Sequence, residues 1–108
     1  MSEKRTWSEG MESDSFTFRL SKEFGEFEIK VTIEHKVLES GETVTDIMTG
    51  QGFHCCRLTW KSGEKVDMHE LAKAFIADYF KGYHVLSDNN EWIPTDSWKK
   101  DIDWPYQK

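Results

Sequence analysis

Long apolar runs and cysteines are scarce in this 108-residue chain. No stretch approaches the roughly 18 to 20 consecutive apolar residues of a membrane-spanning helix, and Met1–Ser15 has no apolar core for a signal peptide. The two cysteines, Cys55 and Cys56, are adjacent. Neighbours on a strand point to opposite faces, so these two are poorly placed to pair with each other. We therefore expect reduced thiols and a cytoplasmic protein.

Basic residues are also in deficit, because 14 Lys and Arg stand against 20 Asp and Glu and give a net charge of −6. Binding to nucleic acid or to an anionic membrane needs clustered Lys and Arg that replace counterions. We therefore expect neither kind of direct binding from this small acidic protein. Its length allows one domain and excludes a two-domain enzyme, and its hydrophobic content of 37% is enough for a core.

The usual signatures of catalysis and metal binding are missing. No pair of ligand-type residues has the spacing of a zinc site, and Gly50–Gln51–Gly52 is too short to cradle a phosphate. A nucleophilic Cys55 or Cys56 needs a stabilised thiolate, for which Arg57 is a weak hint, so core packing explains both thiols better. We expect no catalytic residue, no metal and no cofactor. The candidate ligands weighed are His35, His54, Cys55, Cys56, His69 and His84.

The first half of the chain alternates apolar and polar residues, as strands do. Residues 1–15 are too polar for this pattern and are interpreted as an N-terminal arm. The pattern predicts four strands of an antiparallel meander: Phe16–Leu20, Glu26–Leu38, Thr43–Met48 and Phe53–Trp60. In the fourth, alternation divides the residues into one face with His54, Cys56, Leu58 and Trp60 and another with Phe53, Cys55, Arg57 and Thr59. Which face is the inner one stays open, although Leu58 and Trp60 favour the first.

One amphipathic helix is predicted over Met68–Lys81. Asp67 stands three residues before Glu70, the spacing of a capping box, and Val66 with Leu71 would form a hydrophobic staple. Gly82 is placed to end the helix. Helical spacing predicts a buried stripe of Met68, Leu71, Ala72, Phe75, Ile76 and Tyr79.

The fold class predicted from these elements is α+β. We expect a two-layer sandwich in which one long amphipathic helix crosses a meander of about four strands. It forms a single domain over residues 16–108, with Tyr83–Leu86 as a short edge strand.

The C-terminal tail, residues 88–108, carries Trp92, Trp98 and Trp104 at intervals of six. Two interpretations stay open: the tryptophans complete the core, or part of the tail is presented to a partner, since Trp and Tyr dominate binding hot spots. A mixture would place Trp92 and Trp98 inside and Trp104 to Tyr106 outside. The acidic residues would steer the tail towards a basic patch on the partner. The predicted partner-binding residues are Trp98, Trp104, Tyr106, Asp96, Asp101 and Asp103.

These features predict a noncatalytic module that occupies a surface of another intracellular protein. In size and charge the chain is similar to small immunity proteins and phage-encoded inhibitors, which implies an inhibitor, for example a viral protein. Two alternatives stay open. One is a small-molecule-binding protein or compact enzyme, with a pocket between helix and sheet. The other is self-association through an edge strand, Phe16–Leu20 or Tyr83–Leu86. The predicted pocket residues are Tyr79, Trp60, His54 and Cys56.

Overall fold

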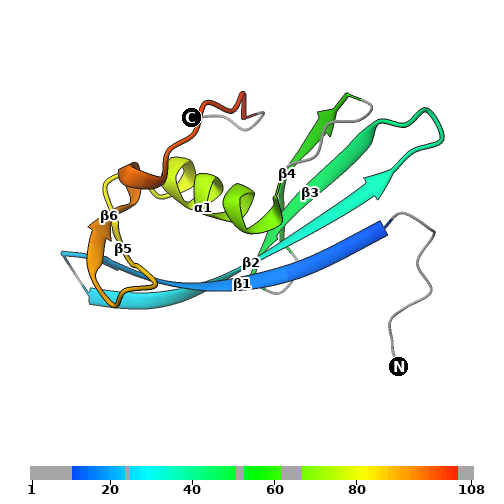
Figure 1. The fold of residues 1–108 in the computed structure, drawn as a ribbon. Helices are drawn as coiled ribbons and strands as arrows, with labels where there is room; N and C mark the ends of the chain where they lie inside the picture. Colours follow the sequence, from blue (N-terminus) through cyan, green and yellow to red (C-terminus); the bar gives the residue numbers. More distant parts are fainter. Residues whose placement is uncertain (1–10, 24, 51–52, 62–66, 105–108) are drawn as a thin grey trace.

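The computed structural model describes residues 11–23, 25–50, 53–61 and 67–104. Six strands form one antiparallel sheet in the order β4-β3-β2-β1-β5-β6, and one helix packs on it (Figure 1). This confirms the predicted α+β class, but four strands is too few, because β5 and β6 extend the sheet beyond β1. The elements are β1 (Met11–Lys22), β2 (Gly25–Val37), β3 (Thr43–Thr49), β4 (Phe53–Trp60), α1 (Met68–Tyr79), β5 (His84–Leu86), β6 (Trp92–Pro94) and the 3-10 helix η1 (Thr95–Trp98). No described helix is long and apolar enough to cross a membrane.

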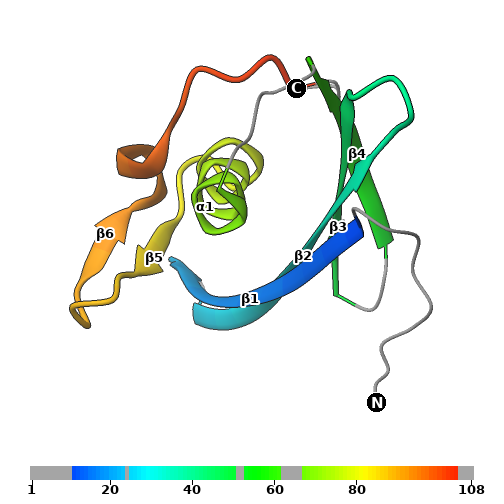
Figure 2. The same ribbon diagram turned by 45° about the vertical axis from the view of Figure 1, so that its right-hand side comes forward.

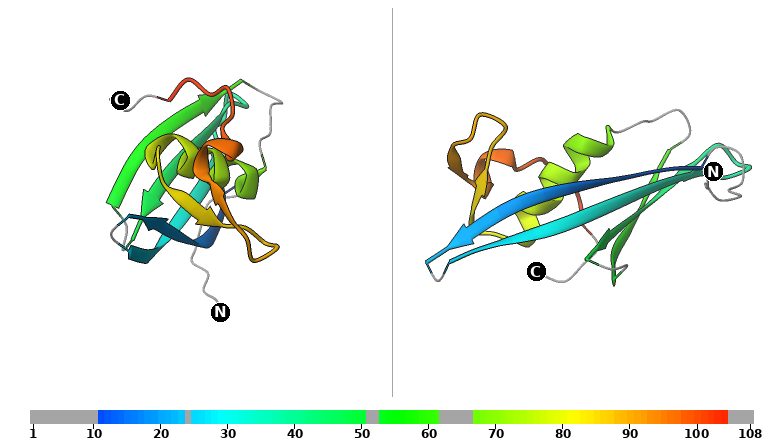
Figure 3. Two further views of the ribbon diagram at one scale, coloured as in Figure 1. Left: turned by 90° about the vertical axis from the view of Figure 1, so that its left-hand side faces the viewer. Right: turned by 90° about the horizontal axis from the view of Figure 1, so that it is seen from below.

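β1 begins five residues earlier than the alternation predicts. Met11 pairs with Lys36 and Ser15 with Thr32, so residues 11–15 belong to the sheet and not to an arm. Residues 12–15 are exposed, and they show no apolar alternation in the sequence. Their strand conformation comes from the long partner β2, which runs beside β1 over its whole length (Figure 3).

The sheet curves around α1, which lies on its concave side (Figure 2). This side supplies the core, because alternate residues of each strand point towards the helix. Tyr83–Leu86 is not at the sheet edge as predicted, because β5 lies between β1 and β6. The largest fully buried side chains are Phe75, Leu20, Ile33, Ile47, Leu71, Ile76, Val31, Val85, Thr45 and Thr95.

α1 begins as predicted, at an N-cap formed by Asp67. The Asp67 carboxylate accepts a hydrogen bond from the Glu70 N–H at 3.0 Å, which satisfies one of the unpaired donors of the first turn. The carboxylate of Glu70 lies 3.7 Å from Lys73 and 3.6 Å from Lys100. The predicted staple partner Val66 lies outside the described residues.

α1 has 12 residues, so it is shorter than the long helix that was expected, and it ends two residues before the predicted end. Phe80 leaves the helical conformation, and its carbonyl accepts a hydrogen bond from the Thr95 hydroxyl at 2.9 Å. Gly82 follows with a φ of 83°, a left-handed conformation that glycine adopts without strain. Tyr79, expected in the buried stripe, is 49% exposed, whereas Ala74 and Ala77 are buried. The stripe is broader because both the sheet and the tail cover the helix.

A β-bulge in β4 overturns the predicted division of its two faces. Ile47 of β3 pairs with Cys56, but the next residue, Met48, pairs with His54, so Cys55 is the extra residue. The bulge places His54 on the outer face, beside Arg57, while Cys56 faces the core. Strict alternation across this strand was therefore the wrong assumption.

A buried polar network crosses the inner face of β2, β3 and β4. The Thr45 hydroxyl accepts a hydrogen bond from the Trp60 indole N–H at 2.8 Å and lies 2.7 Å from Nδ1 of His35. Thr45 is fully buried and His35 is 6% exposed. Buried polar groups cost free energy unless they are hydrogen-bonded, so this shared hydroxyl stabilises two neighbouring side chains.

We expect Thr45→Val to lower the free energy of unfolding by about 1–3 kcal/mol, because an isosteric methyl removes a hydrogen-bond partner shared by the buried His35 and the half-buried Trp60. Urea unfolding followed by circular dichroism measures the difference. Thr59→Val, at an exposed position of β4, is the matched control and should stay within about 0.5 kcal/mol. Equal unfolding midpoints for the two variants would contradict the role of the network.

Candidate functional site

β1 is covered by strands on both sides only at its C-terminal end. β2 pairs with it from Met11 to Lys22, whereas β5 pairs only with Leu20 and Ser21. Among the described residues, no strand lies against the other edge of β1 between Glu12 and Arg19. This open edge carries main-chain donors and acceptors that another strand can use.

The alternation of backbone groups identifies which residues face the open edge. The Ser15 N–H donates to the Asp14 side chain at 2.8 Å, so it is directed away from β2. Main-chain groups alternate between the two edges along an antiparallel strand. Ser13, Thr17 and Arg19 therefore direct their N–H and C=O groups to the same open edge as Ser15.

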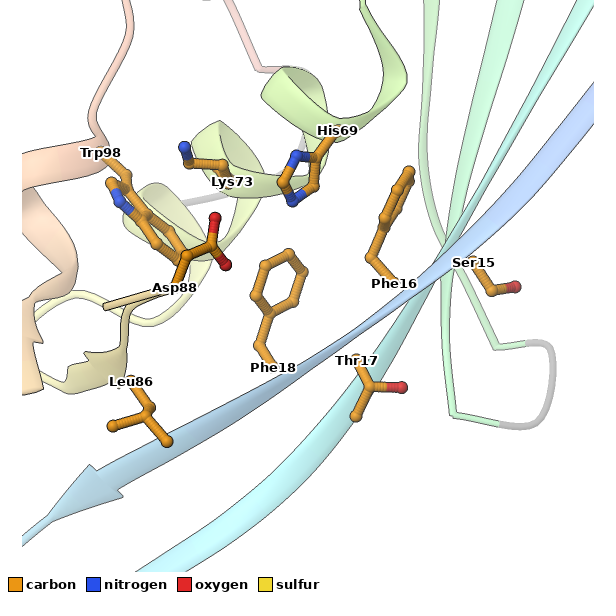
Figure 4. A pocket seen from close by; sticks show the side chains of 9 residues that line it. All are labelled: Ser15, Phe16, Thr17, Phe18, His69, Lys73, Leu86, Asp88 and Trp98. Carbon is orange, nitrogen blue, oxygen red and sulfur yellow. The ribbon is translucent and has the colours of Figure 1, made fainter. Parts of the chain in front are cut away.

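A cavity of about 310 Å³ lies along this edge, between β1, α1 and the tail (Figure 4). Phe16 and Phe18 point from β1 towards His69 on α1, with ring centroids 4.9 and 6.4 Å from the imidazole. Trp98 meets Phe18 edge-on at 5.6 Å. Thr17 turns its side chain away from the cavity that it lines, so it contributes its main chain.

Two polar side chains lie at the rim of this aromatic cavity. Nζ of Lys73 lies 5.1 Å from the centre of the Trp98 ring, and Asp88, which is exposed, lines the same cavity. A cation over an aromatic face is attracted to the ring and also holds it in place. The cavity therefore combines aromatic walls with one positive and one negative group.

A second cavity, of about 300 Å³, continues the first one along β1. Both are lined by Phe16 and His69, and the second adds the carboxylates of Glu12, Asp14 and Asp67. We call the two together the β1 groove. It runs beside the open edge from an acidic end at the start of β1 to an aromatic end near β5.

The predicted tryptophans of the tail have separate places. Trp98 lines the β1 groove and is half-buried. Trp104 is only 6% exposed and packs edge-on against Phe75, so it is a core residue and not an exposed anchor. Trp92, expected inside in the mixed arrangement, is 39% exposed. Tyr106 lies outside the described residues.

The predicted acidic residues of the tail do not join Trp98 in one surface. Asp101 and Asp103 line a different cavity, of about 340 Å³, beside β4, together with Trp60. Asp96 is exposed on η1. Their role in partner binding stays a prediction. The predicted ligand pocket is not formed as expected, because the bulge places His54 and Cys56 on opposite faces.

The exposed ion cluster on the outer face joins β3 to β4. Arg57 donates to both oxygens of Asp46 at 2.7 and 3.1 Å, and Nε2 of His54 lies 3.0 Å from the same carboxylate. The hydrogen bond from Arg57 lowers the pKa of Asp46 below its ordinary range. Asp46 is thereby held as a charged structural partner. The described residues contain no group of three or more His, Cys, Asp or Glu placed to hold a metal ion.

Cys56 is placed as a core residue and not as a nucleophile. Its side chain is 5% exposed, and burial raises the pKa of its thiol from 9.0 to about 12. A rise of that size lowers the thiolate fraction near neutral pH about 1000-fold. Since the thiolate is the reactive form, Cys56 is poorly suited to nucleophilic chemistry.

We expect iodoacetamide to label Cys56 in the folded Cys55→Ser variant about 1000-fold more slowly than in denaturant, because burial suppresses its thiolate. Mass spectrometry of timed samples measures the rate. The Cys56→Ser variant, which keeps the half-buried Cys55, is the control. Rapid labelling of Cys56 in the folded chain would revive a catalytic role for this thiol.

Taken together, the β1 groove offers main-chain hydrogen-bonding groups, aromatic walls and carboxylates beside a strand edge. An extended chain presents complementary features, with main-chain groups along its edge and side chains alternately on its two faces. The chain matches none of the protein-family models, curated proteins or solved structures with which it was compared.

Proposed function

We propose that this protein is a noncatalytic binding module that takes up an extended segment of another protein in the β1 groove. The segment adds to the sheet as a strand beside β1, in line with β5. The observation that carries this proposal is the open edge of β1 between Glu12 and Arg19, next to a cavity walled by aromatic side chains. Strand addition uses main-chain hydrogen bonds for affinity and side-chain pockets for specificity.

The surroundings of the open edge favour a partner strand of limited length. β5 occupies the edge from Leu20 onward, so an added strand has room only between Glu12 and Arg19. In the free protein the Asp14 side chain accepts the hydrogen bond of the Ser15 N–H and thereby occupies one main-chain donor of the open edge. Charged side chains at open edges commonly protect against unspecific pairing, and a specific partner replaces such a contact. In an inhibitor or immunity-type role, the captured segment would be withheld from its own function.

The test is a selection of random peptides displayed on phage against the whole chain, followed by affinity measurements on the enriched peptides. We expect Thr17→Pro to weaken their binding at least about tenfold, because proline removes a main-chain donor from the open edge and places its ring there. Thr17→Val keeps the N–H and is the matched control. The N–H of Thr17 is not part of the ladder with β2, so the proline leaves that ladder intact.

Hydrogen exchange gives a second measurement that needs no variant. Bound peptide should slow exchange of the amides of Ser13, Thr17 and Arg19, because they gain partners at the open edge. Equal binding to Thr17→Pro and Thr17→Val, or unchanged exchange at these amides on binding, would overturn strand addition. An unenriched library would also overturn it.

A further inference from the structure

The two ends of the β1 groove differ in charge. At the start of β1 the groove is lined by the carboxylates of Glu12, Asp14 and Asp67, and the lining of this cavity contains neither Lys nor Arg. At the other end the rings of Phe18 and Trp98 line the groove, together with one cationic and one anionic side chain, Lys73 and Asp88. A ligand that runs along the groove therefore meets a surplus of carboxylates first, and then aromatic rings beside groups of opposite charge.

The N-terminus of α1 does not cancel the acidic end. A helix N-terminus carries about half a positive charge, whereas three carboxylates line this cavity. One oxygen of Asp14 accepts the Ser15 N–H, and one oxygen of Asp67 accepts the Glu70 N–H. Each of these two carboxylates has a second oxygen that these hydrogen bonds do not use, and the third carboxylate belongs to Glu12, which is exposed. The net charge at this end stays negative and favours a cationic ligand group.

The pleat of β1 sets the spacing of the ligand groups. Glu12, Asp14, Phe16 and Phe18 are alternate residues, and all four line the cavities on the inner face. Residues of an added strand that lie opposite them also point inwards, at every second position. Two successive inward positions therefore face carboxylates, and the next two face aromatic rings.

We infer that the captured segment carries Lys or Arg at two alternate positions and apolar or aromatic residues at the next two alternate positions. This inference rests on the proposed strand addition and specifies its partner. The two basic residues lie beside the start of β1. In a segment parallel to β1 they therefore precede the apolar residues, and in an antiparallel segment they follow them. The basic side chains meet the acidic end of the groove, and the apolar ones pack against the half-buried rings of Phe16 and Trp98.

The test uses two fluorescent synthetic peptides of equal composition. One peptide carries the two basic and the two apolar residues at the positions that point into the groove. In the other peptide the two basic residues are moved to the intervening positions, which point outwards. Anisotropy titrations compare the wild type with the double variant Glu12→Gln/Asp14→Asn, which removes two charges while the Asn oxygen can still accept the Ser15 N–H. The matched control is Glu28→Gln/Glu34→Gln, which removes two charges from the outer face of β2.

We expect the patterned peptide to bind at least about tenfold more tightly than its rearranged partner. Glu12→Gln/Asp14→Asn should lose about tenfold in affinity at low ionic strength, and the control should change less than about twofold. Equal binding to both double variants, with Thr17→Pro still harmful, would overturn the charge inference and leave strand addition standing. Binding that is insensitive to Thr17→Pro would overturn both strand addition and the charge inference that rests on it.

Discussion

Replacing Trp104 by alanine should lower the free energy of unfolding by about 3–5 kcal/mol. Trp104 is 6% exposed, and its indole meets the fully buried Phe75 edge-on at 6.1 Å. Truncation removes a large apolar side chain and leaves a cavity between the tail and α1. Domains of this size have total stabilities of about 5–15 kcal/mol, so the variant should unfold at a much lower urea concentration.

The control for this substitution is Trp92→Ala. Trp92 is 39% exposed on β6, so its truncation should cost about 1 kcal/mol. Both variants are measured by urea unfolding with circular dichroism, which does not depend on the number of tryptophans. If Trp104→Ala costs no more than Trp92→Ala, the tail does not belong to the core and the burial of Trp104 has no energetic weight.

Trp98→Ala should act mainly on peptide binding, whereas Trp104→Ala acts mainly on stability. We expect affinity for the selected peptides to fall about 30-fold, which corresponds to about 2 kcal/mol, the usual loss at an aromatic hot spot. Trp98 is half-buried, forms one wall of the β1 groove and meets Phe18 edge-on. Isothermal titration calorimetry at one temperature and salt concentration measures the change.

Trp98→Phe should recover most of this affinity, because it keeps an aromatic wall beside Phe18. Trp92→Ala serves again as a control, since Trp92 does not line the described cavities of the groove. A Trp98→Ala variant that is folded and binds the selected peptides as tightly as wild type would contradict the role of this wall. It would place the peptide elsewhere on the protein.

The elements that depend on neighbouring residues were predictable from the sequence. Asp67 caps α1 because its carboxylate needs only the N–H three residues ahead. The alternation after Gly25 identifies β2, since Val31 and Ile33 point to the core while Lys30 and Thr32 do not. Trp98 was also predicted to bind a partner from its residue type, and this stays a prediction, whereas its neighbours in the groove were not predicted.

The β1 groove itself depends on residues far apart in the sequence. Phe16 and Phe18 were expected only as part of the strand Phe16–Leu20, and no sequence pattern connects them with Lys73 of the helix. The groove exists because β5 is shorter than β1, and no local sequence pattern predicts this difference in strand length. Glu12 and Asp14 were assigned to an arm, because a strand exposed on both faces lacks apolar alternation.

The sequence by itself determined the α+β class, the first four strands in outline and the start of the helix. Each of these follows from side-chain periodicity or from contacts between residues a few positions apart. Only the tertiary structure decided the burial of Trp104, the bulge at Cys55 and the open edge of β1. These features depend on the register and length of strands that are far apart in the sequence. Such strands pair only when the sheet closes around α1, and this long-range packing selects among the conformations that the local sequence allows.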